Sequence, residues 1–165
     1  MPLPNPADNF RLKAAEGWLE LGDWNEANNE LDTITPKLRA NPEVLRVRLK
    51  IYEAAGKWDL AVEVARAICV SNPGTASNWT SWAAALHQLK RTEDALNVLL
   101  SIIDRFPDDY LIPFHLARYT CRLGRHKEAF NWLEKAIDLD SSTKVRLLAL
   151  EDQEFEPLWA AISEI

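Results

Sequence analysis

Apolar residues recur along this chain at helical spacing, in runs of about a dozen residues separated by short polar or glycine-containing turns. Ala61, Ala65 and Ile68, for example, advance by four and then three positions, which places them on one face of a helix. The pattern predicts helices over residues 8–21, 24–35, 43–55, 58–71, 76–89, 92–105, 110–123 and 126–139. The sequence therefore predicts an all-α protein.

The pattern also repeats with a period of 34 residues. Three series of residues share this register: Ala27, Ala61, Ala95 and Ala129; Leu31, Ala65, Leu99 and Leu133; Ile34, Ile68, Ile102 and Ala136. Before each alanine of the first series stands a turn that contains Gly22, Gly56 or Gly124, with Lys90 in place of the glycine in the third copy. A glycine there can end a helix in a left-handed conformation. A period of this length is typical of stacked helical hairpins, because a single hairpin cannot bury its own apolar face.

These residues resemble the tetratricopeptide repeat (TPR) family. The match is best in the third copy, at Trp79, Trp82, Ala83, Ala95 and Pro107. The other copies depart from the family pattern at Arg11, Arg48, Leu49, Pro113 and Thr120. The resemblance implies a TPR-like α-solenoid of four helical hairpins, with repeats at about residues 8–41, 42–75, 76–109 and 110–143 of a single domain, 1–165.

The end of the chain, about residues 144–165, is expected to cap this array. Phe155, Leu158, Trp159 and Ile162 follow helical spacing and suit a C-terminal capping helix over the open end of the stack. Asp152 is the expected N-cap, with Pro157 in the first turn. Pro36 should end the second helix early and begin a short extra turn.

Charge and composition restrict the partners. The formal net charge of −6 argues against a protein that grips nucleic acid through its whole surface, although a local basic patch remains compatible. No apolar run is long enough to span a membrane, and the first residues lack a secretory signal. Cys69 and Cys121, far apart and without a CxxC motif, are expected to be reduced thiols in the cytoplasm.

Catalytic motifs are missing from the sequence. The three histidines, His87, His115 and His126, lack metal-binding spacing, and there is no P-loop, GxGxxG or GxSxG. Cys121 is the exception worth noting, because the nearby Arg118 and Arg122 could lower the pKa of its thiol. No base accompanies it, and we expect neither an enzyme nor a bound metal or cofactor.

The resemblance implies that the first helices of the hairpins line a concave, peptide-binding groove. The residues predicted to line it are Arg46, Lys50, Thr80, Ser81, Ala84, His87, Phe114, His115, Arg118 and Arg122. Arg46 and Lys50 share one side of a helix, and Arg118 and Arg122 repeat that spacing. The predicted partner is a protein or peptide with acidic residues and an apolar anchor that meets Phe114. The other interpretation is that these cations pair with neighbours such as Glu43 or Glu53.

Two further interpretations stay open. The chain could instead be a structural scaffold that self-associates into a homo-oligomer. The stretch Pro113-Phe114-His115 is also similar to the repeat-built chaperones of type III secretion translocators. The carboxylate clamp by which some TPR proteins bind chaperone tails uses paired asparagines with lysines. That clamp is absent here, because no asparagine stands at the corresponding repeat positions, one of which holds Glu16, Lys50 and Ala84. The pentatricopeptide family, which binds RNA, fits neither the period nor the charge.

Overall fold

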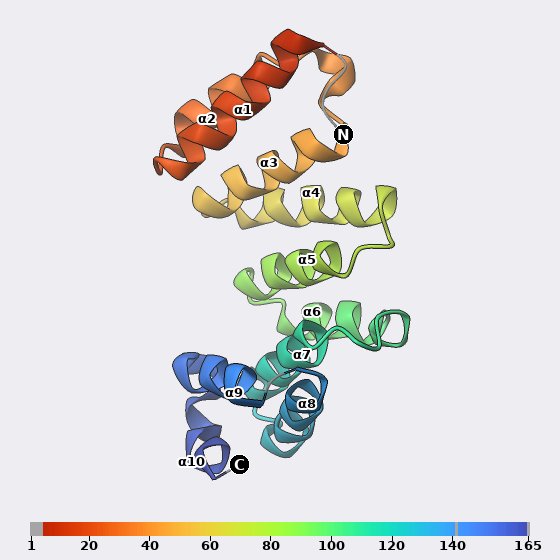
Figure 1. Cartoon of the computed structure of the whole chain (residues 1–165), viewed down its shortest axis with the longest axis vertical. Helices are drawn as coiled ribbons and strands as arrows, with labels where there is room; N and C mark the ends of the chain where they lie inside the picture. The colour runs from red at the N-terminus through yellow and green to blue at the C-terminus, as the bar shows by residue number, and fades with distance from the viewer. Residues whose placement is uncertain (1–4, 141, 165) are drawn as a thin grey trace. The chain divides into compact units, whose positions relative to one another are not determined.

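The computed structural model describes residues 5–140 and 142–164, and Ser142 through its backbone alone. The first four residues of the predicted domain, Ser141 and Ile165 lie outside this description. Within the described residues every regular element is a helix, as predicted, and the successive hairpins belong to the all-α solenoid class (Figure 1). The chain divides into two compact units, Met1–Asn78 and Trp79–Ile165. The assignment of four repeats to a single domain stays a prediction.

The first unit is built from two hairpins. Its elements are α1 (Pro6–Glu20), α2 (Trp24–Asp32), the 3-10 helix η1 (Pro36–Leu38), α3 (Pro42–Ala54) and α4 (Trp58–Ser71). Helix α1 packs on α2 and α3, and α3 packs on α2 and α4. The core between α1, α2 and α3 holds Leu12, Ala15, Ala27, Leu31, Ile34, Val44, Val47 and Ile51.

The second unit follows from Trp79 onward. Its elements are α5 (Ala76–Gln88, whose first turn belongs to the first unit), α6 (Thr92–Leu100), η2 (Ile103–Arg105), α7 (Leu111–Arg122), α8 (His126–Leu139), α9 (Ser142–Glu151), η3 (Gln153–Leu158) and α10 (Trp159–Ser163). Helix α7 packs on α6 and α8, α9 packs on α8 and α10, and η3 contacts α7, α8, α9 and α10. A core cluster here includes Phe114, Ala117, Cys121, Ala129, Leu133, Ala136, Val145, Ala149, Phe155, Leu158 and Ile162.

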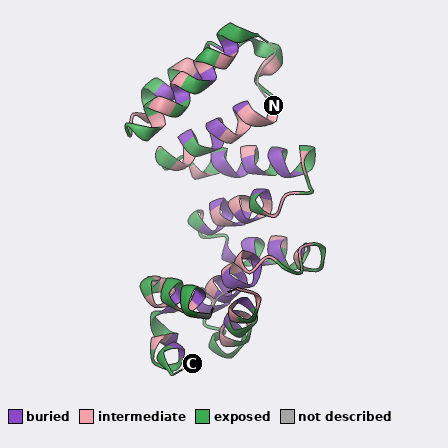
Figure 2. Cartoon of the chain, viewed as in Figure 1, coloured by how far each residue is buried: buried purple, intermediate pink, exposed green. Residues whose placement is uncertain are grey.

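The alanine series is fully buried in both units. Ala27, Ala61, Ala95 and Ala129 are all 0 % exposed. The two companion series are buried as well, and Figure 2 shows buried residues gathered along particular sides of the helices. These alanines are buried where helices pack, and a larger side chain at the same position would crowd that packing.

The turns between paired helices are left-handed where the sequence predicts them. Gly22, Gly56 and Gly124 have φ angles of 81°, 66° and 76°. Lys90 takes the same conformation with φ 63°, although a side chain makes it costly. Lys90 therefore performs the glycine's structural role in the third copy.

Several helix ends differ from the prediction. Helix α2 ends at Asp32 rather than residue 35, and Thr33 N–H donates to the Glu30 carbonyl in a tightened final turn. Helix α6 likewise ends at Leu100, not residue 105, and the Ser101 hydroxyl donates to the Val98 carbonyl at 2.6 Å. Hydroxyl side chains compete with the helical ladder in this way. The predicted short turn at Pro36 is confirmed as η1.

The C-terminal cap is more broken than a single helix. Asp152 is the predicted N-cap, accepting a hydrogen bond from Glu154 N–H at 3.0 Å. It caps η3, however, and Pro157 lies inside that 3-10 helix, before the five-residue α10. The prediction of Pro157 in a first α-helical turn is wrong, because α10 begins only after it at Trp159. The Trp159 indole N–H donates to the Ala149 carbonyl at 3.2 Å and holds this end against α9.

In the part of the chain that the structure describes, no helix combines the length and the apolar character needed to cross a lipid bilayer.

Candidate functional site

The predicted groove residues fall into both units. Arg46 and Lys50 lie on α3 of the first unit. The other eight lie on α5 and α7 of the second unit; they are Thr80, Ser81, Ala84, His87, Phe114, His115, Arg118 and Arg122. We call these eight the α5–α7 surface. One continuous groove through both units stays a prediction, and each set is described within its own unit.

On α3 the cations behave as ordinary surface residues. Arg46 Nη1 lies 2.5 Å from Glu43 Oε1, one helical turn away, and both side chains are more than a third exposed. The hydrogen bond from Arg46 lowers the pKa of Glu43. Lys50 is exposed. For Arg46, the alternative of pairing with a neighbouring carboxylate is confirmed.

Helices α5 and α7 contact each other through the tilted rings of His87 and Tyr119. The His87 ring lies 4.9 Å from that of Tyr119, which is 0 % exposed. Within α7, the His115 ring stacks on the Tyr119 ring at 5.9 Å. The His115 ring also lies 6.0 Å from that of Phe114. This aromatic cluster holds the α5–α7 surface in place, because ring pairs at such distances attract beyond their buried area.

His87 is buried and held on both sides. Its Nδ1 lies 3.1 Å from Thr92 Oγ1, and its Nε2 lies 3.5 Å from Glu154 Oε1. Burial lowers the pKa of His87, although Glu154 acts in the opposite direction. The imidazole is therefore neutral near pH 7, and its contact with Glu154 is a polar one.

The C-terminal segment reaches onto the α5–α7 surface. Arg118 Nε lies 3.1 Å from Asp152 Oδ2, and Arg122 Nε lies 3.7 Å from Glu154 Oε2. The Phe155 ring lies 5.5 Å from that of Phe114 and is 0 % exposed. The predicted cationic pair on α7 is thus matched by carboxylates of the same chain.

Sequence reasoning missed these partners. It assigned Phe155 to an end cap and did not connect Asp152 and Glu154 with Arg118 and Arg122. A signal was present, because the run Asp152-Gln153-Glu154-Phe155 carries the acidic residues and apolar anchor predicted for a ligand of this surface.

His115 is largely shielded from solvent beside Phe114 and Tyr119. Burial, assisted by the neighbouring Arg118, lowers the pKa of His115 to about 4. Protonation is unfavourable because a buried charge loses its hydration. His115 is therefore neutral near pH 7. His126, by contrast, is exposed at the start of α8, as expected for a turn residue.

The expectation for the Cys121 thiol is wrong. Burial, together with Glu154 and Asp152, raises its pKa instead of lowering it. The two arginines that could stabilise a thiolate are themselves paired with these carboxylates. Cys69 is 1 % exposed, and burial raises its pKa to about 12, in agreement with its expected role as core filling. Both thiols are free and buried.

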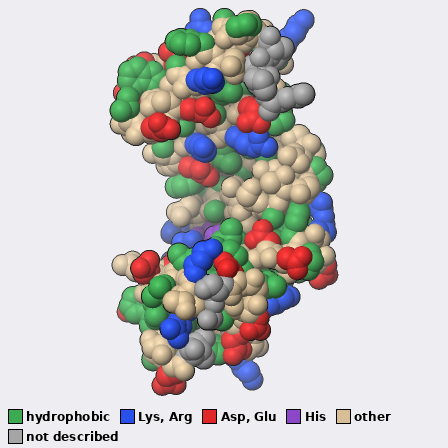
Figure 3. Space-filling model, viewed as in Figure 1, with side chains coloured by type: hydrophobic (Ala, Val, Ile, Leu, Met, Phe, Trp, Pro, Cys, Tyr) green, Lys and Arg blue, Asp and Glu red, His purple; other side chains and the backbone are tan. Residues whose placement is uncertain are grey.

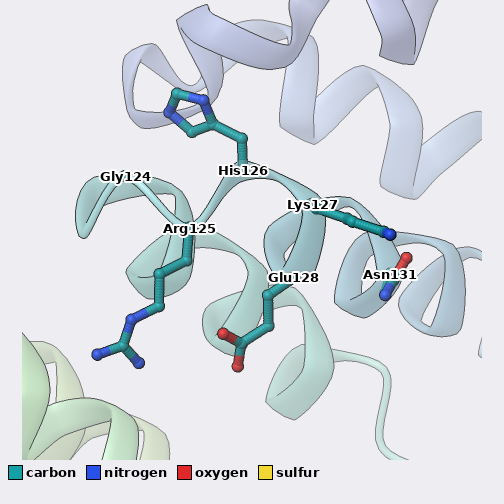
Figure 4. Close-up of a pocket in the computed structure, with 6 residues that line it drawn as sticks. All are labelled: Gly124, Arg125, His126, Lys127, Glu128 and Asn131. Carbon is teal, nitrogen blue, oxygen red and sulfur yellow. The ribbon is translucent and has the colours of Figure 1, made fainter.

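The second unit has a hollow at the α7–α8 turn. Its volume is about 600 Å³, and it is lined by Gly124, Arg125, His126, Lys127, Glu128 and Asn131. Figure 4 shows its side chains pointing in different directions, with His126 directed away from Arg125 and Glu128. Among the described residues, no three or more His, Cys, Asp or Glu side chains are grouped to hold a metal ion. Figure 3 shows acidic and basic side chains intermixed on the visible surface.

Comparison with known proteins supports the fold. No protein-family model matches the chain, and no curated protein matches it either. Solved structures of MamA, a protein of TPR-like helical repeats, do match. MamA 41-end from Desulfovibrio magneticus RS-1 has a TM-score of 0.74 at 17 % identity, over 98 % of this chain and 96 % of that one. MamA of AMB-1 has a TM-score of 0.68 at 22 % identity, over 88 % of this chain and 79 % of that one. At these identities the similarity shows the fold alone.

Proposed function

We propose that this chain is a non-catalytic protein-interaction module that holds a peptide or protein segment against the first helices of its repeats. The observation that carries the proposal is the α5–α7 surface, where Arg118, Arg122, His87 and Phe114 already contact the acidic segment that begins at Asp152 and continues in η3. The TPR-like fold supports it, since stacked hairpins present broad surfaces of this kind.

The chemistry of the same surface favours binding over catalysis. A nucleophile needs an activating base or a lowered pKa. The Cys121 thiol has a raised pKa, and the neighbouring His115 is held neutral by burial and stacked beside Tyr119. The side chains gathered here are those that recognise another chain: cations for carboxylates and aromatic rings for apolar anchors.

The test is affinity capture from the native lysate with two matched variants. Ala84→Arg places a large cation on the partly exposed centre of the α5–α7 surface, while Asn131→Arg places the same residue on exposed α8. We expect Ala84→Arg to lose the captured partner and Asn131→Arg to keep it, with both variants unchanged in helical content by circular dichroism. Capture that survives Ala84→Arg and fails with Asn131→Arg would place the binding surface on the second helices instead.

A second candidate function is self-association, favoured by a different observation in the first unit. Phe10 and Trp18 lie on α1 and Leu21 is its C-cap residue, and the three are 73 %, 37 % and 77 % exposed. Clustered exposed apolar residues mark interaction surfaces. Light scattering across a range of concentrations tests it: a dimer that Phe10→Ser with Leu21→Ser abolishes supports self-association, and a concentration-independent monomer removes it.

A further inference from the structure

The segment Asp152–Leu158 contacts the α5–α7 surface at three separate points. Asp152 pairs with Arg118, and Phe155 packs its ring on Phe114. Glu154 reaches two residues at once, with Oε1 3.5 Å from His87 Nε2 and Oε2 3.7 Å from Arg122 Nε. Two acidic residues and an aromatic anchor, arranged along one short segment, are how a bound peptide engages a surface.

Capping alone does not account for these charges. A cap needs to cover apolar surface, and Phe155, Leu158 and Ile162 do so, being at most 8 % exposed. Arg122 is 53 % exposed and Arg118 27 % exposed in their ion pairs. The more exposed pair, Arg122 with Glu154, contributes little to folding stability, and both pairs select for the charge of a partner.

The backbone of the segment is also suited to exchange. Its residues 153–158 form the 3-10 helix η3, which contains Pro157 and leads into the five-residue α10. A 3-10 helix has poorer hydrogen-bond geometry than an α-helix, so its backbone adds little to holding the segment; the main contact that an external segment must replace is the buried Phe155 ring.

We propose that the α5–α7 surface recognises protein segments of the pattern acidic–any–acidic–Phe, and that residues 152–155 of this chain occupy it as an internal ligand. An external segment of the same chemistry must displace the internal one, so the module is autoinhibited. The inference rests on the proposed function and deepens it by stating the class of partner segment.

The test uses a labelled peptide with the sequence of residues 150–160, blocked at both ends, and fluorescence anisotropy with the full chain. The key protein variant is Asp152→Asn with Glu154→Gln, which removes two charges from the internal segment; asparagine also retains the N-cap of η3. We expect the peptide to bind this double variant at least tenfold more tightly than the wild type, because its competitor is weakened.

Controls separate recognition from nonspecific attraction. A peptide with Ala in place of its Phe should lose most of its affinity for the double variant, and adding Arg118→Gln to that variant should weaken the binding of the original peptide. Binding should also weaken as salt rises, because exposed charges are screened. Equal affinity for the wild type and the double variant, or binding indifferent to the Phe, would overturn the proposal.

Amide hydrogen exchange tests displacement of the internal segment in the wild-type chain. It therefore keeps the proposal testable even if the double variant fails to fold. Excess peptide should increase amide exchange in residues 152–163 and leave α3 unchanged. If saturating peptide leaves that segment fully protected, the internal ligand is not displaced and the proposal fails. The double variant could instead form a dimer in which two copies exchange their C-terminal segments. That result would mean that the surface binds a second copy of this chain, and it would overturn the proposal of an external partner segment.

Failure of the acidic–any–acidic–Phe pattern can be distinguished from failure of the proposed function. Loss of lysate partner in Ala84→Arg, combined with no peptide binding, would keep the interaction module and reject only the acidic–Phe pattern.

Discussion

Helices α3 and α7 carry the same basic pair at the same spacing, yet the two pairs have different surroundings. On α3, Arg46 pairs with Glu43 of its own helix, and Lys50 is exposed. On α7, by contrast, Arg118 pairs with Asp152 and Arg122 pairs with Glu154. Both carboxylates lie far from α7 in the sequence, in the segment that follows α9. The same spacing therefore leads to different electrostatic surroundings, and only the tertiary structure decides which carboxylates each pair meets.

The largest test of this difference removes the anchor of the α7 side. Phe155→Ala should destabilise the protein by about 3–5 kcal/mol, because it deletes a ring that is 0 % exposed and leaves a cavity against Phe114. Denaturant unfolding measures it. The matched change Phe10→Ala, at a ring that is 73 % exposed, should alter the free energy of unfolding by less than about 0.5 kcal/mol. Equal effects would mean that the C-terminal segment is not part of the core.

Acid should weaken the second unit through His115. Its folded pKa of about 4 lies below the ordinary value of 6.5, so the unfolded chain binds the proton more strongly. The stability associated with the neutral ring is fully present above about pH 6.5 and is lost as pH falls towards 4.

The measurement compares the free energy of unfolding of the wild type with that of His115→Gln from pH 7 to pH 4. We expect the wild type to lose about 2–3 kcal/mol more than the variant, which cannot titrate there. His126→Gln, at an exposed position, should run parallel to the wild type. A His115→Gln profile that runs parallel as well would show that the ring is solvated.

A smaller effect is expected from the cations themselves. Arg118→Gln should cost about 1–2 kcal/mol, because it leaves the partly buried Asp152 without its partner. Arg46→Gln should cost no more than about 0.5 kcal/mol, since its pair with Glu43 is exposed and local. Thermal unfolding at low and high salt compares them. If both changes cost the same, the two basic pairs would be equivalent after all.

The smallest effect concerns the turns. Lys90→Gly should stabilise the protein by about 0.5–1 kcal/mol, because it relieves a left-handed lysine with φ 63°. In the first unit Gly56, with φ 66°, already holds this conformation, and Gly56→Ala should destabilise by about 1 kcal/mol. Calorimetry of the pair checks both signs. A destabilised Lys90→Gly would mean that the lysine side chain contributes contacts which outweigh its backbone strain.

The sequence by itself determined the helices, the turns and the core positions of the repeat. The 34-residue alanine series, the left-handed turns and the N-cap at Asp152 were all predictable, because they depend on local conformation and on side-chain size at a repeated contact. The helix ends at Asp32 and Leu100 were not, since they depend on local competition between hydroxyl groups and the backbone ladder.

Only the tertiary structure decided what faces the α5–α7 surface. Nothing in the helical period places Asp152 beside Arg118, or indicates that burial and the nearby carboxylates raise the pKa of the Cys121 thiol. Both depend on where residues after α9 fold back, and that path is set by the apolar contacts of Phe155, Leu158 and Ile162 with helices far away in sequence. Electrostatic surroundings follow distance in space, which a local pattern does not contain.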